Sequence, residues 1–266
     1  MSRSTWNGTL SFGLIHLPVS LFTAVREQDV KFRQLCPVHR QPISMKRICA
    51  GAPGGDPAEA HEVAQGDLVS GYEHAPGQFV VVTKEERAAS REDKASFDVR
   101  LFVPHDALDP RLFDKPYLVL PQKPDAARTY ALLREALARS SKTGIGLITL
   151  RTKQHMGAIR VAGDVVLLQT LHWPDELVDM GEFALPGGTG LGDREVALAL
   201  QLVDSLSGAL ATAEFKDGHR ERLQRLIMAR AEGEEPEPDV RGEPGGTPVT
   251  DLVALLEASI AARRAA

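Results

Sequence analysis

The sequence predicts a mainly β protein with added α-helices, in which the β part is a barrel or a sandwich. Short apolar runs recur through the first 170 residues and are separated by Gly, Pro and Asp, which is the spacing of an all-β domain. Only one strongly helical pattern interrupts them. The runs are Leu10–Leu17, Val19–Val25, Phe79–Thr83, Phe97–Val103, Tyr117–Leu120, Ile145–Arg151 and Val165–Leu171.

The first strand is expected close to the start of the chain. Leu10, Phe12 and Leu14 alternate with smaller or polar residues, which is the period of a half-buried strand. Gly13 permits a bulge or bend that a side chain would resist. Taken alone, this segment indicates an ordinary first strand of a β-rich domain.

One amphipathic helix is expected inside the β part, over Asp125–Ser140. Asp125 can cap the helix N-terminus, because its carboxylate can accept from the free backbone N–H groups there. Tyr130, Leu133 and Leu137 fall on one face at helical spacing. That face is expected to pack on the sheet.

Two further helices are expected after the β part. Asp193 can cap the first, and Val196, Leu200 and Val203 share one of its faces. The second is expected over about 219–231. Residues 233–248 are acidic, rich in Pro and almost without apolar side chains, so they cannot bury enough surface to order themselves and are expected to form a linker.

A last amphipathic helix is expected over 249–266, with Thr250 as its cap. Such a short helix needs a surface to lie on, either its own core or a partner protein. The residues of its apolar stripe are Val249, Leu252, Val253, Leu256 and Ile260.

Charge is distributed unevenly along this acidic chain, whose formal net charge is −5. Residues 1–170 hold 22 Lys and Arg against 18 Asp and Glu, whereas residues 171–266 hold 9 against 18. Between Ala136 and Gly163 there is no carboxylate at all, and a second basic cluster runs from Arg26 to Arg47. A local basic surface is therefore possible, although scattered charges on loops can also be simply solvated.

Catalytic signatures are absent from the sequence. It has no Gly-x-Ser-x-Gly, no His-Glu-x-x-His and no phosphate loop ending in Gly-Lys-Ser/Thr. Arg151, Lys153 and His155 would share one face of a strand, which suits a row of phosphate contacts better than an active site. We expect neither an enzyme nor a cofactor.

Two cysteines fit a reducing compartment, and no stretch approaches the roughly 18 apolar residues of a membrane span, so a cytoplasmic protein is expected. The candidates for a structural zinc site are Cys36, His39, Cys49 and His61. The alternative is two ordinary thiols.

Beyond the opening run Trp6–Val19, six further segments stand in a characteristic order and spacing: Val69–Glu73, Phe79–Thr83, Phe113–Leu118, Tyr130–Leu137, Leu150–His155 and Asp251–Ser259. Together these segments resemble the bacterial Ku family. Members of that family are homodimeric DNA-end-binding proteins of non-homologous end joining. The resemblance covers nearly the whole chain, but the family's cysteine pairs are incomplete here, because Cys49 lacks its second thiol.

The resemblance implies a Ku-type β-barrel core with a DNA-encircling bridge, followed by a helical C-terminal arm. It implies a core with bridge at 1–192, an arm that embraces the second subunit at 193–232, the linker at 233–248 and a partner-binding helix at 249–266. The bridge is expected within the carboxylate-free run from Ala136 to Gly163. The implied partners are double-stranded DNA ends, a second copy of the chain and ligase D, and the location is the bacterial nucleoid.

Sequence-independent binding to DNA ends needs basic side chains on the backbone phosphates. The candidates for phosphate contact are Lys31, Arg33, Lys46, Arg47, Arg128, Lys142, Arg151, Lys153 and Arg160. The candidates for ligase contact are Leu252, Val253, Leu256 and Ile260. The alternative function is a non-enzymatic β-rich scaffold that acts through protein partners by its last helix.

Overall fold

The computed structural model describes residues 3–49, 51, 60–90, 95–184, 190–234 and 252–265. The chain divides into two compact units, one formed by residues 1–27 and 33–179 and the other by residues 28–32 and 180–266. The predicted boundary at 192 therefore differs from the contact-based one, which follows Asp179. None of the helices in the described stretches is long and apolar enough to cross a membrane.

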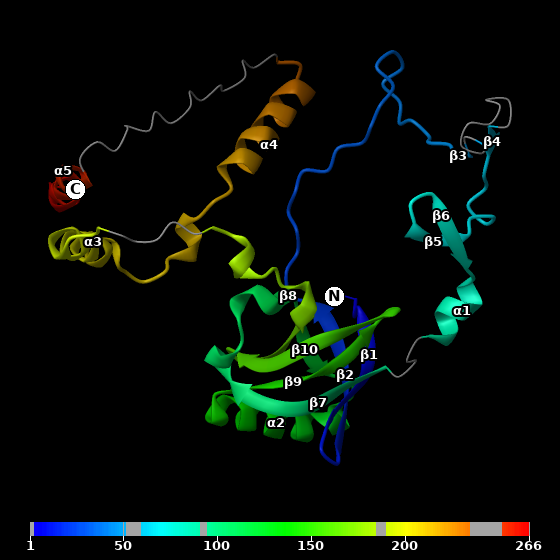
Figure 1. Cartoon of the computed structure of the whole chain (residues 1–266), viewed down its shortest axis with the longest axis horizontal. Coiled ribbons are helices and arrows are strands. Elements are labelled where there is room, and N and C mark those ends of the chain that lie inside the picture. The colour runs from blue at the N-terminus through cyan, green and yellow to red at the C-terminus, as the bar shows by residue number, and fades with distance from the viewer. Residues whose placement is uncertain are drawn as a thin grey trace. The chain divides into compact units, whose positions relative to one another are not determined.

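The first unit holds a closed barrel of seven strands (Figure 1). Its strands in chain order are β1 (Trp6–Phe12), β2 (Ile15–Thr23), β7 (Ser96–Pro104), β8 (Phe113–Pro121), β9 (Lys142–Leu150), β10 (Lys153–Ala162) and β11 (Val165–Leu171). Around the barrel they follow the order β1-β2-β8-β11-β10-β9-β7. The parallel pairing of β1 with β7 closes it, with Thr9 opposite Ser96. Of the two predicted architectures, the barrel is correct.

Helix α2 (Ala127–Ser140) covers one end of this barrel. Its buried residues Leu133 and Leu137 belong to the predicted apolar face. Leu133 and Leu137 are buried in the same cluster as Leu10, Phe97 and Ile159 from the strands. The Val166 backbone N–H donates to the Tyr130 hydroxyl at 3.0 Å, which fixes the helix to the start of β11.

Two local predictions are corrected. The run Leu10–Leu17 is not one strand, because the chain reverses at Gly13, whose φ of 59° is open to glycine. Asp125 does not cap α2, because Pro124–Ala126 forms a 3-10 turn ahead of the helix and Ala126 occupies the cap position without a side-chain hydrogen bond.

The other end of the barrel is where a long segment leaves and returns, and we call it the excursion end. β2 finishes at Thr23 opposite Tyr117, near the start of β8. β7 begins beside the end of β9, with Phe97 opposite Ile148. The antiparallel registers therefore place the two ends of segment 24–95 at the same end of the barrel as the β9–β10 turn.

Segment 24–95, called the excursion below, contains short elements outside the barrel. They are β3 (Ile48–Cys49), β4 (His61–Glu62), β5 (Ser70–Ala75), β6 (Gln78–Val82) and α1 (Lys84–Ala89). β3 pairs only with β4, and β5 only with β6, in the described part of the chain. None of its described residues is buried, so it has no core of its own.

The predicted position of the bridge, between Ala136 and Gly163, is wrong. Those residues form the end of α2 and the strands β9 and β10, which pair with each other along their lengths and carry the buried Ile148 and Ile159. The absence of carboxylates from this run does not require contact with DNA phosphates. Packing in the barrel also explains it, since charged groups are rarely buried. The longest segment inserted between the described barrel strands is the excursion.

The second unit contains α3 (Asp193–Leu206), α4 (Gly218–Ala231) and α5 (Leu252–Ala265), together with two 3-10 turns, Met180–Glu182 and Thr212–Glu214. The three helices were predicted, but Gly192 rather than Asp193 is the cap of α3. The expected linker at 233–248 and the cap at Thr250 fall largely or wholly outside the described residues.

Candidate nucleic-acid interface

Arg151 and Lys153 lie at the excursion end of the barrel. Arg151 occupies the turn between β9 and β10 with a φ of 57°, and Lys153 is the first residue of β10. Both side chains are exposed. The prediction that Arg151 shares a strand face with Lys153 and His155 is wrong for Arg151, because the chain reverses at that residue.

His155 shares the face of Lys153, two residues further along β10. It stands opposite Ile148, a core residue, so it lies at the rim of the barrel interior. Partial burial lowers the pKa of His155 below its ordinary value, and the charge of Lys153 lowers this pKa further, against the opposing effect of Asp114 and Glu176. At neutral pH the imidazole is therefore uncharged, and the positive charge at this rim comes from Lys and Arg.

Lys115 and Arg26 are basic residues at the same end that were not among the predicted contacts. Lys115 is exposed near the start of β8, where its backbone N–H donates to Thr170 Oγ1 at 3.0 Å. Arg26 is exposed three residues after the end of β2. In the sequence, both residues lie beside the end of an expected strand. That position identifies them as candidate DNA contacts only once the directions of the strands in the barrel are known.

Arg128 and Lys142 lie at the opposite end of the barrel. Arg128 is exposed in the first turn of α2, and Lys142 begins β9 opposite Pro104. The structure therefore does not bring them together with Arg151 and Lys153, although all four belong to one basic stretch of sequence.

Arg160 lies on the barrel wall and is engaged within the protein. Its Nη2 donates to Gln169 Oε1 at 3.1 Å, and its guanidinium carbon stands 5.3 Å from the centre of the Phe113 ring. A cation over an aromatic face at this distance is attracted to the ring. Among the predicted DNA contacts on the barrel, Arg160 is thus the one whose side chain is engaged in contacts within the barrel itself.

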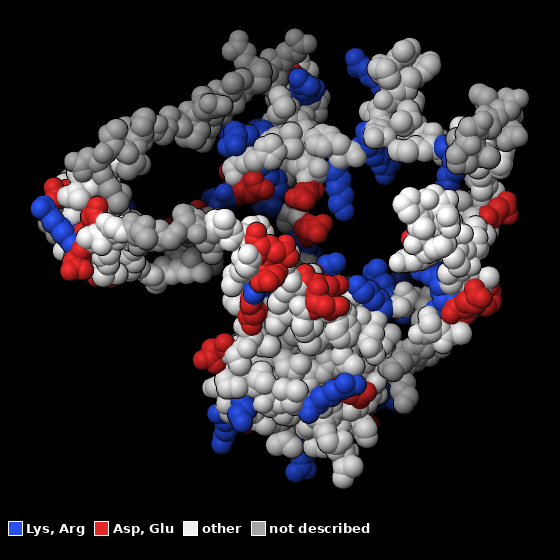
Figure 2. Space-filling model, in the orientation of Figure 1, with Lys and Arg blue, Asp and Glu red and all other residues white. Residues whose placement is uncertain are grey.

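The excursion carries the remaining predicted contacts, Lys31, Arg33, Lys46 and Arg47, and all four are exposed. Lys46 Nζ forms an ion pair of 2.7 Å with Glu62. Figure 2 shows blue Lys and Arg side chains along the part of the excursion that Figure 1 draws between β2 and β3. Between residues 24 and 47 there are six Lys and Arg against two acids, on a backbone with no buried residue. Such a segment can adapt its path to a phosphate backbone without exposing buried apolar side chains.

The zinc candidates come together as two pairs and not as one cluster. Cys36 Sγ and His39 Nδ1 are 3.5 Å apart in a turn, and Cys49 stands opposite His61 in the β3–β4 ladder. No group of three His, Cys, Asp or Glu side chains that could hold a metal ion occurs among the residues that the structure describes.

The candidate ligase-binding helix α5 packs on α3. Arg194 Nη2 pairs with Glu257 Oε1 at 2.9 Å, and Ile260 is 7% exposed. Val253 and Leu256 are half-buried, while the Leu252 side chain lies outside what the structure describes. The apolar stripe of α5 is thus in contact with its own chain.

The comparisons with known proteins agree with the barrel. Residues 11–187 match the family model described as the Ku70/Ku80 beta-barrel domain. The protein named Non-homologous end joining protein Ku from Anaeromyxobacter sp. (strain K) is 36% identical over 267 residues, which is 99% of this chain and 87% of that protein. Proteins with the same name are similar in Mycolicibacterium smegmatis (strain ATCC 700084 / mc(2)155), with 32% identity over 98% of this chain and 83% of theirs, and in Bacillus subtilis (strain 168), with 29% identity over 97% and 81%. The chain belongs to the Ku family.

Proposed function

We propose that the protein binds the ends of double-stranded DNA as a homodimeric ring in non-homologous end joining, and that it recruits ligase D. Membership of the Ku family carries the first part, since its relatives are named for this pathway. Encirclement uses shape and phosphate contact, so the protein does not read sequence and needs an end to thread onto.

The excursion is the segment that crosses the DNA in this proposal. It starts and finishes at the end of the barrel that carries Arg151 and Lys153, and its first half is strongly basic. DNA therefore lies against the excursion end of the barrel, and the basic first half of the excursion adds phosphate contacts. Arg128 and Lys142, at the α2 end, contribute little to binding.

A gel-shift titration on one duplex, linear and as a closed circle, tests the threading. At about 50 and 200 mM salt, six to ten phosphate contacts change the affinity by roughly 10³ to 10⁵. Tight binding to the linear duplex alone is expected. Equal binding to both forms contradicts the ring, and binding to neither favours the scaffold alternative.

Two charge-reversal variants then compare the two ends of the barrel. Arg151→Glu with Lys153→Glu is expected to abolish end binding, because two attractive charges become repulsive. The matched variant Arg128→Glu with Lys142→Glu changes the net charge by the same amount at the α2 end, and it is expected to bind nearly as the parent does. An equal loss of affinity for DNA ends in both variants would show that the contact surface extends beyond the excursion end.

The contact with ligase D belongs to α5 in this proposal. Because the apolar stripe of α5 lies on α3, the ligase has to take the place of α3 or use the more exposed side that carries Leu255. Deletion of residues 250–266 is expected to preserve end binding and to lose the stimulation of ligation. Full stimulation by the truncated protein would remove α5 from this role.

A further inference from the structure

Strand β6 is an exposed edge strand without the usual protection of such edges. Its sequence, Gln78–Val82, has no charge, no Pro and no Gly, and its one partner in the described chain is β5. Exposed edges are normally blocked by Lys, Pro, bulges or covering segments because their unpaired N–H and C=O groups recruit further strands. β5 differs, since it carries Gly71, Glu73 and a bulge between Glu73 and Ala75.

The β5–β6 hairpin is also too small to account for its apolar surface. Tyr72 is 69% exposed and stands opposite Val80, and Phe79 is 62% exposed opposite Glu73 on the other face. Apolar residues therefore lie on both faces of a two-stranded ladder, and an isolated hairpin of this kind is marginally stable in water. A further strand on the free edge of β6 would pair the open N–H and C=O groups. It would also enlarge the two-stranded hairpin into a more stable sheet.

DNA does not fit this surface. Residues 48–83 contain no Lys or Arg and five acids, in contrast to the six basic residues between 24 and 47. A phosphate backbone is repelled by this composition. The excursion thus changes, at about residue 48, from a basic part suited to DNA to an acidic and apolar part suited to protein.

A second copy of this chain is the partner that the chemistry of β6 selects. Two copies of one strand related by a two-fold axis pair antiparallel, and an uncharged strand meets itself without repulsion. Pairing β6 with its copy extends two hairpins of two strands into one sheet of four, which is an ordinary sheet size.

We propose that β6 is a homodimer contact, in which the Gln78–Val82 edges of two subunits pair antiparallel and join the two excursions. The inference rests on the proposed homodimer and specifies where one of its interfaces lies. In the proposed ring, this contact closes the bridge over the DNA.

Disulfide crosslinking tests the pairing and its register in the full chain. In a Cys36→Ser, Cys49→Ser background, each of the five β6 residues is changed singly to Cys. Antiparallel pairing about a two-fold axis puts one residue opposite itself, with Cα atoms about 4.5–5.5 Å apart, inside the range of about 4.4–6.8 Å for a disulfide. Its neighbours are displaced from their own copies by two residue rises, about 6.8 Å. Covalent dimer is therefore expected at one of the five positions.

Sedimentation equilibrium on a matched pair of variants gives an independent measurement. Val80→Lys puts like charges on the paired edge and is expected to raise the dissociation constant of the dimer. Tyr72→Lys removes a comparable exposed apolar side chain from the same face but on β5, and it is expected to leave the dimer unchanged. Equal weakening by both variants would contradict pairing through the edge.

The outcomes also separate this inference from the function on which it rests. A parent protein that sediments as a dimer and binds DNA ends, but gives no covalent dimer at any β6 position, overturns the β6 contact and leaves the proposed function standing. Covalent dimer at all five positions alike shows non-specific association and also overturns the contact. A parent that sediments as a monomer with DNA overturns both.

Discussion

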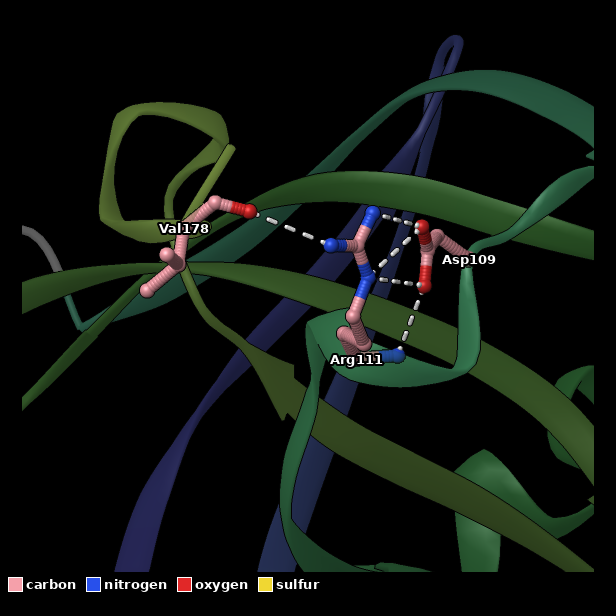
Figure 3. Close-up of polar contacts among 3 residues, drawn as sticks. All are labelled: Asp109, Arg111 and Val178. Carbon is pink, nitrogen blue, oxygen red and sulfur yellow. Dashed lines mark hydrogen bonds and ion pairs between the residues drawn. The ribbon is translucent and has the colours of Figure 1, made fainter. Parts of the chain in front are cut away.

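Arg111 encloses the carboxylate of Asp109, two residues earlier in the chain, and reaches across to the segment that leaves the barrel (Figure 3). Its Nη2 donates to Asp109 Oδ2 at 2.7 Å, and its Nε donates to both carboxylate oxygens at 3.1 Å. Its Nη1 donates to the Val178 carbonyl at 3.2 Å. Val178 stands one residue before the boundary between the two units. This pair therefore fixes the last residues of the barrel unit to the loop before β8.

Arg111→Ala is expected to loosen the segment around Val178 while leaving the thermal unfolding midpoint of the barrel nearly unchanged. An exposed ion pair contributes little to global stability because solvent screens it, but the cross-segment hydrogen bond is lost outright. Hydrogen exchange measures the effect at residues 174–179. Arg139→Ala is the matched control, because the partner of Arg139 within the described residues is Glu135 on its own helix, at 2.7 Å. Unchanged exchange in Arg111→Ala would contradict the assigned role.

The same pair makes this segment sensitive to acid. The hydrogen bond from Arg111 holds the pKa of Asp109 below its ordinary value of 3.8. A carboxylate whose pKa is lowered on folding stabilises the native state above the unfolded pKa, and this contribution is lost as the pH falls through the folded value. Asp109→Asn should therefore remove part of the acid sensitivity of exchange near Val178 without altering exchange at neutral pH in the α2 helix.

Arg151→Gly is expected to raise stability and lower DNA affinity. A positive φ costs a non-glycine residue on the order of 1 kcal/mol, which glycine does not incur. The substitution also removes one cation from the excursion end, so the slope of log affinity against log salt should fall by about 0.9. Urea unfolding and salt-dependent gel shifts measure the two effects.

Arg160→Ala should give the reverse pattern. Its contacts with Gln169 and Phe113 are internal, so its loss is expected to cost about 0.5–1 kcal/mol of unfolding free energy with little change in the salt slope. Were Arg160→Ala to lower the slope as Arg151→Gly does, the barrel wall would belong to the DNA contact.

Gly146→Ala is expected to disrupt the barrel where β9 meets β7. A methyl group added at Gly146 would lie 2.0 Å from the Asp98 carbonyl oxygen, and this neighbour is backbone that cannot rotate away. Overpacking of this kind typically costs about 1–3 kcal/mol. Gly208→Ala, at a position with nothing within 4 Å, is the control and should be nearly neutral. Urea denaturation compares them, and equal stability would contradict the close β7–β9 approach.

Ile260→Asp is expected to release α5 from α3. Burying an Ile side chain is worth about 1.5–3 kcal/mol, and a carboxylate at the same position cannot be buried without a partner. Leu255→Asp is the matched control on the same helix, since Leu255 is 38% exposed. Faster hydrogen exchange over residues 253–263 in Ile260→Asp alone supports the docking, and identical exchange in both variants contradicts it.

The residues that follow a local period were predictable, because secondary structure and the buried face depend on neighbours in the sequence. Val165–Leu171 was predicted with the bounds that it has, and Leu133 and Leu137 were predicted on the buried face of α2. The basic character of residues 24–47 was also visible, since charge is a property of composition.

Only the tertiary structure decided which of these parts meet. The closure of the barrel by β1 and β7 joins segments almost 90 residues apart, and no local pattern specifies that register. The same closure puts Arg151 and Lys153 at one end of the barrel and Arg128 and Lys142 at the other, and it makes 24–95 rather than 136–163 the inserted segment. The sequence by itself determined most of the barrel strands, helix α2, the three C-terminal helices and the distribution of charge. Their partners depended on packing between distant segments, because an apolar face can be buried against any matching surface and only the whole fold selects one.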